Sequence, residues 1–210
     1  MDCVIMKRLS NFFGYLAIFL FILSFAIAFT INFTPLYSFD IGYLNIEELT
    51  GFSKEVIMEN YRILLKYLNY PWITELNMPD FPSSESGLFH FYEVKRLFML
   101  DYAILFLSGI YSFFFIRKKV KEGDKWEMIQ PTRIMMAIPI VVLIFIFLNF
   151  NSLFITFHEL FFNNDAWLFD WRTDPIILAL PQSFFMHCFI SVFLILESGI
   201  AGLYFWSKQK

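Results

Sequence analysis

Four long segments of the chain are almost free of charged residues, and they limit its fold more than any other feature. They cover residues 12–31, 97–116, 134–157 and 181–206. A helix needs roughly 20 apolar residues to cross a bilayer, and each segment reaches that length. Hydrophobic residues make up 58% of the chain, more than the interior of a soluble fold of this size can bury. We therefore predict an all-α integral membrane protein with four transmembrane helices, which excludes a soluble enzyme and a nucleic-acid-binding protein.

The loops between these segments differ in charge. The two terminal segments and residues 117–133 hold ten basic and four acidic residues, a net charge of +6, whereas residues 32–96 and 158–180 hold six basic and thirteen acidic residues, a net charge of −7. Basic loops stay on the cytoplasmic side of a membrane. We expect both termini and the 117–133 loop to be cytoplasmic and the other two loops to be extracellular.

This pattern divides the chain into seven parts. The predicted order is a cytoplasmic start with helix 1 (1–31), an extracellular cap (32–96), helix 2 (97–116), a cytoplasmic basic loop (117–133), helix 3 (134–157), an extracellular aromatic-rich loop (158–180), and helix 4 with a cytoplasmic tail (181–210). The first apolar run is longer than the 7–15 residues of a signal peptide, so we expect it to be an uncleaved helix. The cap should be small and mostly helical: Gly51 is expected to end a short helix over 46–50, and Ser53 to begin a second one with apolar residues at helical spacing.

All three histidines of the chain, His90, His158 and His187, fall near the predicted outer face. For each histidine alone, a structural residue with one hydrogen bond is an equally good interpretation. Glu93 lies three residues after His90 on the same helix face, where its carboxylate could fix the imidazole tautomer. A zinc-site spacing, a cysteine–histidine pair on one helix face and a Gly-x-Ser-x-Gly elbow are all absent from the sequence. We therefore expect no metal and no cofactor, and histidine acid–base chemistry if the chain is an enzyme.

The second predicted outer loop is rich in aromatic residues. Phe161, Phe162, Trp167 and Phe169 are either belt residues at the membrane interface or the lining of a pocket. Asp174-Pro175 is typical of a helix start, and Pro181 is expected to kink the helix that follows. Two acids, Asp101 and Glu197, fall within predicted spans; we expect the first to be near the surface and the second to serve helix packing.

Four strings of the sequence resemble the bacterial lipoprotein intramolecular transacylase family. They are Glu-Ser-Gly-Leu-Phe-His-Phe-Tyr-Glu-Val-Lys (85–95), Phe-His-Glu-Leu-Phe-Phe (157–162), Trp-Leu-Phe-Asp (167–170) and Asp-Pro-Ile-Ile-Leu-Ala-Leu-Pro (174–181). The four-span layout with an outer cap also resembles that family along nearly the whole chain. Two positions depart from its pattern: Glu93 stands where an aspartate is expected, and Gln182 stands where a glutamate is expected.

The resemblance implies an acyl transfer within one lipoprotein. The acyl chain leaves the sn-2 position of the diacylglyceryl group on the N-terminal cysteine and joins the α-amine of that cysteine, which gives a lyso-form lipoprotein. It implies that His90 and His158 are catalytic. We interpret His158 as the base and His90 as the acid and oxyanion donor. Glu93, Asp170 and Asp174 are expected to orient or support the site, and Phe161, Phe162, Trp167 and Phe169 to contact the substrate.

Two alternatives stay open from the residues alone. The chain could be another outer-leaflet lipid acyltransferase or hydrolase, or it could be a non-enzymatic membrane subunit that packs through its phenylalanine-rich surface. In the favoured interpretation its partners are the lipoprotein substrate and membrane lipid, without nucleic acid, and it acts as a monomer. The role of His187 and the effect of Gln182 are not predicted.

Overall fold

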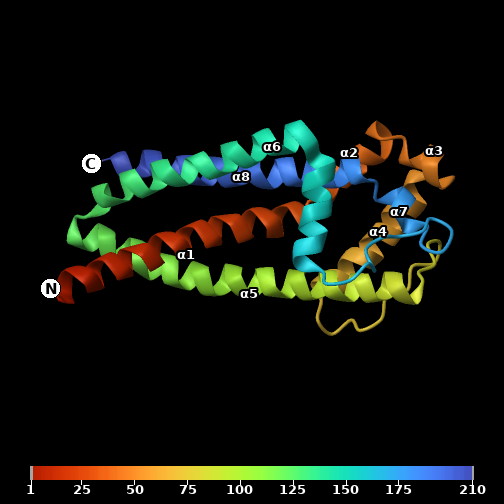
Figure 1. The fold of residues 1–210 in the computed structure, drawn as a ribbon, viewed down its shortest axis with the longest axis horizontal. Helices are drawn as coiled ribbons and strands as arrows, with labels where there is room; N and C mark the ends of the chain where they lie inside the picture. Colours follow the sequence, from red (N-terminus) through yellow and green to blue (C-terminus); the bar gives the residue numbers. More distant parts are fainter. Residues whose placement is uncertain (1, 210) are drawn as a thin grey trace. The chain divides into compact units, whose positions relative to one another are not determined.

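The computed structural model describes residues 2–209 of the chain, and in that range it consists of helices and loops (Figure 1). Met1 and Lys210, the outermost residues of the first and last predicted parts, lie outside the described residues. Four helices are long and apolar enough to cross a membrane: Ile5–Asn32, Glu85–Glu122, Lys125–Phe161 and Gln182–Lys208. The all-α membrane fold with four transmembrane helices is thus confirmed.

The long helices extend beyond the predicted spans. They are α1 (Asp2–Asn32), α5 (Glu85–Glu122), α6 (Ile129–Phe161) and α8 (Gln182–Lys208). A short 3-10 helix, η1 (Lys125–Met128), precedes α6. Helix α5 begins at Glu85, well before the predicted span begins at residue 97. Charged residues lower the hydropathy of residues 85–96, so the predicted span starts late although the backbone there is helical.

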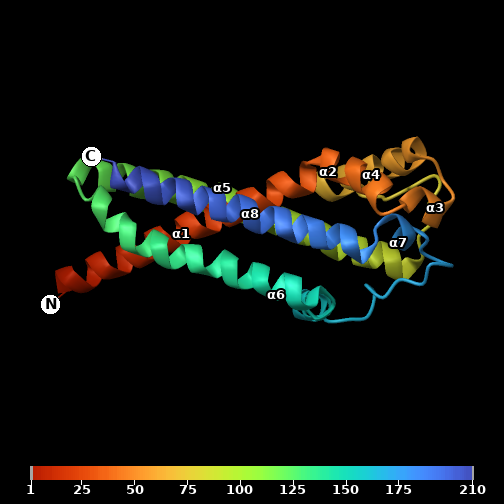
Figure 2. The same cartoon turned by 90° about the horizontal axis from the view of Figure 1, so that it is seen from above.

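Four shorter helices complete the fold. They are α2 (Thr34–Tyr43), α3 (Ile46–Thr50), α4 (Lys54–Asn69) and α7 (Ile176–Ala179). The predicted bounds of the 46–50 helix are confirmed, and Gly51 follows it with φ of 73°, a left-handed conformation that glycine adopts without steric cost. Helix α3 contacts α2 and α7, and α2 contacts α4; these helices lie together in both views (Figures 1 and 2).

The chain divides into two compact units. Unit 1 comprises the described residues of Met1–Thr30, Asp101–Phe145 and Ile190–Lys210. Helix α1 packs closely on two other helices there: a Cβ atom added at Gly14 would lie 2.3 Å from the ring of Phe115 in α5, and one added at Gly199 in α8 would lie 2.6 Å from Ile22. Such contacts between small residues and neighbouring helices are typical of transmembrane packing.

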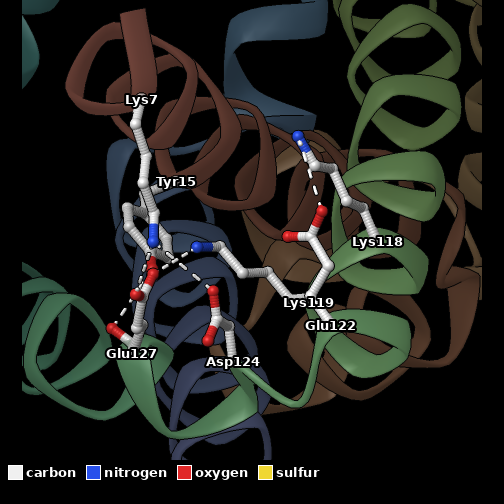
Figure 3. Close-up of polar contacts among 7 residues, drawn as sticks. All are labelled: Lys7, Tyr15, Lys118, Lys119, Glu122, Asp124 and Glu127. Atoms are coloured by element: carbon white, nitrogen blue, oxygen red, sulfur yellow. Dashed lines mark hydrogen bonds and ion pairs between the residues drawn. The ribbon is translucent and has the colours of Figure 1, made fainter. Parts of the chain in front are cut away.

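A network of charged residues joins α1, α5 and the η1 segment within unit 1 (Figure 3). The Lys119 ammonium is buried and donates to Glu127, and Lys7 contacts the same carboxylate at 3.1 Å. Tyr15 donates to the backbone carbonyl of Glu127 at 3.1 Å. Asp124 accepts from Lys7 at 3.5 Å. Glu127, which lies in the predicted basic loop, therefore links η1 to both α1 and α5.

Unit 2 comprises Ile31–Leu100 and Ile146–Phe189 and has its own apolar core. Helix α4 contributes one face, with Ile57, Leu64 and Leu68 almost fully buried. Tyr37 of α2 packs on Tyr61 of α4, with ring centroids 3.9 Å apart and ring planes inclined by 33°, and it donates a 2.7 Å hydrogen bond to the carbonyl of Ala179. The short helices thus hold one another in place.

Two helix interruptions in unit 2 shape the region of the candidate site. Asn149 leaves the helical conformation within α6 (φ −161°, ψ 76°), and its side chain accepts from the backbone amide of Ser152, so the helix restarts behind an asparagine cap. The predicted helix from Asp174 through a kink at Pro181 is instead two helices. Helix α7 ends at Ala179, and α8 begins after Pro181, because proline has no amide hydrogen to continue the helix.

Candidate active site

Unit 2 brings His90 and His158 together from different helices. His90 lies near the start of α5, and His158 lies in the last turn of α6. Their ring centroids are 5.9 Å apart, and the ring planes are inclined by 32°. This separation leaves the two imidazoles within reach of adjacent atoms of one substrate.

The proton on the ring of His158 is placed by a backbone contact. Its Nδ1 lies 2.7 Å from the carbonyl oxygen of Phe154, one helical turn earlier. A carbonyl oxygen only accepts hydrogen bonds, so Nδ1 carries the proton and donates. In the neutral ring the lone pair is then on Nε2, which is the nitrogen that can take a proton.

His90 has a different environment. Its side chain is 7% exposed, and its Nδ1 is buried with no hydrogen-bond partner in residues 2–209. A buried polar atom without a partner is costly. The arrangement therefore offers an unused hydrogen-bonding position next to His158.

Aromatic rings surround the two histidines. Measured between ring centroids, Phe162 lies 4.7 Å from His90 and 5.6 Å from His158. On the same measure Phe169 lies 5.5 Å from His90, and Trp167 lies 4.7 Å from His158. Three of the four predicted substrate-contacting residues thus line the pair. Phe161 instead packs on Phe157 at 4.7 Å and is about half exposed.

The three predicted supporting acids occupy different positions. Glu93 is hydrogen-bonded by the amide of Asn164 at both carboxylate oxygens, at 3.0 and 3.1 Å, rather than by His90. Asp174 is buried and accepts from the backbone amide and the hydroxyl of Ser84. Asp170 is exposed and accepts locally from the amide of Arg172.

His187 has its own partner. Its Nδ1 lies 2.8 Å from Oδ1 of Asp40, which is fully buried. Burial raises the pKa of Asp40, and the hydrogen bond and charge of His187 oppose that rise. No ring contact joins His187 to His90 or His158 among the residues that the structure describes. Gln182, at the start of α8, donates to Asn151 at 3.3 Å.

The two acids of the predicted spans do not belong to unit 2, which holds the histidine pair. Asp101 and Glu197 belong to unit 1, and each has one buried carboxylate oxygen without a hydrogen-bond partner in the described range. No group of three or more metal-ligating side chains was found between residues 2 and 209. The sequence assigned no role to Asn164, Ser84 or Asp40, although Asn164 lies in a polar stretch, residues 163–165, just before Trp167.

The fold and the paired histidines define a multi-pass membrane protein with a compact polar site enclosed by aromatic rings. The family model of the lipoprotein intramolecular transacylase Lit matches residues 12–185. The chain therefore belongs to the lipoprotein intramolecular transacylase family and is an acyltransferase, which confirms the resemblance drawn from the sequence strings.

Solved structures give the same result. The membrane-integral lipoprotein intramolecular transacylase Lit from Bacillus cereus matches with a TM-score of 0.91 and 29% identity, over 96% of this chain and 94% of that chain. Two variants of that enzyme, with a histidine replaced by arginine or by alanine, match with a TM-score of 0.84 and 29% identity, over 97% of this chain and 91% or 92% of theirs. No curated protein sequence matches the chain.

Proposed function

We propose that the chain moves the sn-2 acyl chain of a diacylglyceryl-cysteine lipoprotein to the α-amine of that same cysteine. The amine nitrogen attacks the ester carbonyl, a C–N bond forms and the C–O bond to the glyceryl group breaks. The product is an N-acylated lyso-form lipoprotein with a free sn-2 hydroxyl. The observation that carries the proposal is the contact of His158 Nδ1 with the carbonyl of Phe154, beside a His90 whose buried Nδ1 has no hydrogen-bond partner in residues 2–209.

His158 acts as the general base in this mechanism. An α-amine has a pKa near 8, so much of it is protonated and cannot attack. With Nδ1 held by the carbonyl of Phe154, Nε2 of His158 receives the proton that the amine loses. General acid–base assistance of this kind contributes roughly 10²–10⁴-fold.

His90 acts as the acid and oxyanion donor. Its ring is 5.9 Å from that of His158, so one histidine can face the amine while the other faces the ester. Donation to the developing oxyanion stabilises charge where water is excluded. For attack by the neutral amine, the proton given to the departing glyceryl oxygen balances the one that His158 takes, so the pair ends with its original number of protons. An amine that starts as the ammonium releases one further proton to solvent.

The aromatic rings hold the substrate in this mechanism. Phe162, Trp167 and Phe169 form the apolar wall for the acyl and glyceryl groups, and Phe161 extends it on the exposed side. Because the amine and the ester belong to one molecule, orientation in a confined site lowers the barrier. The proposed mechanism requires no covalent enzyme intermediate, metal or cofactor.

We also infer the orientation of the chain in the membrane. The excess of basic residues supports cytoplasmic termini and a cytoplasmic 117–133 loop, with 32–96 and 158–180 outside. The active site then lies at the extracellular membrane interface. Both histidines come from one chain, so a monomer with its lipoprotein substrate and the surrounding lipid suffices.

The test is mass spectrometry of the N-terminal lipopeptide of a reporter lipoprotein made with this protein or with its His158→Ala variant. Intramolecular transfer leaves the total mass unchanged, so fragmentation must locate each acyl chain. We expect an N-acylated, S-monoacylglyceryl cysteine with the wild type alone. An unmoved sn-2 acyl chain with both proteins, at equal expression, would contradict the proposal.

The proposed orientation has a separate test. A cysteine placed in the 117–133 loop should stay unlabelled by an impermeant thiol reagent in intact cells, and one placed in the 70–84 loop should be labelled. Both background cysteines are first replaced by serine. Labelling of the 117–133 position from outside would reverse the topology.

A further inference from the structure

The segment between Phe162 and Asp174 carries the aromatic rings that contact the histidines, and we call residues 162–174 the aromatic strap. It is hydrogen-bonded to the α5 region at two places. Near its start, Asn164 bonds Glu93; at its end, Asp174 bonds Ser84, which directly precedes α5. The rings of Trp167 and Phe169 lie between these two attachments.

The first attachment fixes the amide of Asn164 at both of its ends. Its Nδ2 donates to the two carboxylate oxygens of Glu93 at 3.0 and 3.1 Å, and its Oδ1 accepts from the backbone amide of Ala166 at 2.9 Å. Bonds to an ionised carboxylate are stronger than those between neutral groups. The backbone that leads directly into Trp167 is therefore held by Glu93.

Glu93 lies three residues after His90, on the same face of α5. Both side chains are thus attached to one rigid stretch of helix. Through Asn164, the position of the strap is set relative to His90, while the strap itself places Trp167 at 4.7 Å from His158 and Phe169 at 5.5 Å from His90.

We propose that Glu93 is a positioning residue that acts through Asn164 on the aromatic strap, and not through the imidazole of His90. It sets the spacing of the aromatic wall against both histidines, and with it the fit of the acyl-ester substrate. The consequence for catalysis rests on the proposed function; the consequence for the strap does not.

A length-conserving exchange of the two groups tests this relation. The variant Asn164→Asp puts two carboxylates against each other, whereas Glu93→Gln with Asn164→Asp restores one amide and one carboxylate with their places exchanged. In this double variant the carboxylate on the strap can still accept from the amide of Ala166. Asn163→Asp is the matched control, because it adds the same charge at an exposed neighbouring residue.

Acyl transfer should follow the pair. We expect Asn164→Asp to lower kcat/KM on the order of 10–100-fold, the size expected when a reacting group is displaced by about 1 Å. The double variant should recover most of that loss, and Asn163→Asp should resemble the wild type. An Asn164→Asp variant with wild-type kcat/KM, or a double variant no better than the single one, would overturn the proposal.

The fluorescence of Trp167 supplies a readout that does not need turnover. The chain contains five tryptophans, so the emission of each variant is compared with that of the same variant carrying Trp167→Phe. We expect Asn164→Asp to shift the Trp167 emission to longer wavelength and the double variant to restore it. If the double variant restores the emission and folds like the wild type, but the wild type shows no acyl transfer, only the proposed function is refuted. If Asn164→Asp leaves the Trp167 emission unchanged, the positioning role is refuted.

Discussion

Nδ1 of His158 donates a 2.7 Å hydrogen bond to the carbonyl oxygen of Phe154, one turn earlier in α6. That carbonyl lies more than one turn before the end of α6 at Phe161, and a backbone carbonyl has two lone pairs, so it can accept the ring proton as well as a backbone N–H. The bond fixes the ring nitrogen that is free to react, as a carboxylate does in a catalytic triad. In the proposed mechanism this backbone carbonyl takes the place of a third side chain that orients the base.

The first prediction concerns the histidine pair. His158→Gln and His90→Gln should each reduce the initial rate of acyl transfer by roughly 10²–10⁴-fold. The double variant should be little worse than the more damaging single one, because groups that act as a unit are not additive. The measurement is the appearance of N-acylated lipopeptide, located by fragmentation.

His187→Gln is the control for this series, since the ring of His187 bonds Asp40 and contacts neither His90 nor His158 in the described chain. It should keep most of the activity at equal folded protein. Wild-type activity of the His158→Gln variant would rule out His158 as the base.

The second prediction compares two aromatic residues of the same region. Trp167 packs on His158, whereas Phe161 packs on Phe157 and is about half exposed. Trp167→Ala should therefore raise KM and lower kcat, because the wall next to the base is lost, and Phe161→Ala should have a smaller effect. The measurement is acyl transfer at varied substrate concentration in detergent micelles, and equal effects of the two changes would count against a wall formed by the strap.

The spans were predictable because each needs only a long apolar run. The span of α5 was predicted to begin only at residue 97 because Glu93, Lys95 and Arg96 lower the hydropathy, although the helical spacing of His90 and Glu93 already indicated a helix before it. The break at Asn149 was missed because the short polar stretch 149–152 contains no proline or glycine and lies within a long, mostly apolar segment. Such breaks depend on a side-chain cap that composition does not reveal.

The candidate site was predictable only where a local pattern carried it. All three histidines were selected by type and by predicted depth, and the family resemblance singled out His90 and His158. Trp167 was selected with its aromatic neighbours. The helical spacing that linked Glu93 to His90 is real, but the carboxylate bonds Asn164, 71 residues away in sequence. Asp40 and His187 are 147 residues apart. Tertiary contacts over such distances leave no periodicity in one sequence.

The third prediction concerns the close approach of α5 to the end of the strap. A Cβ atom added at Gly87 would lie 2.1 Å from Oδ1 of the buried Asp174. Gly87→Ala must displace this carboxylate from Ser84. We therefore expect the free energy of unfolding to fall by roughly 1–3 kcal/mol from the lost hydrogen bonds alone. Thermal unfolding in detergent measures it.

Gly42→Ala is the matched control, because a Cβ atom there meets nothing within 4 Å. Alanine is the better helix former by roughly 0.5–1 kcal/mol, so this variant should be at least as stable as the wild type. Equal stability of the Gly87→Ala and Gly42→Ala variants would show that the Asp174 attachment contributes little.

The fourth prediction concerns the pH dependence of stability at Asp40. Burial raises the pKa of this carboxyl in the folded state, and His187 only partly opposes the rise. An acid with a raised pKa binds its proton more tightly in the folded state, so its contribution to stability is present at acid pH and is lost as the pH rises through the raised pKa.

In Asp40→Asn the amide oxygen can still accept from Nδ1 of His187, and no charge is buried. The Tm of the variant relative to the wild type should therefore increase as the pH rises from about 4, the ordinary range of aspartate, toward neutrality. Thermal unfolding in detergent at a series of pH values measures this difference, and a difference that stays constant or falls over the series would show that Asp40 is no more costly to ionise in the folded state than in the unfolded chain.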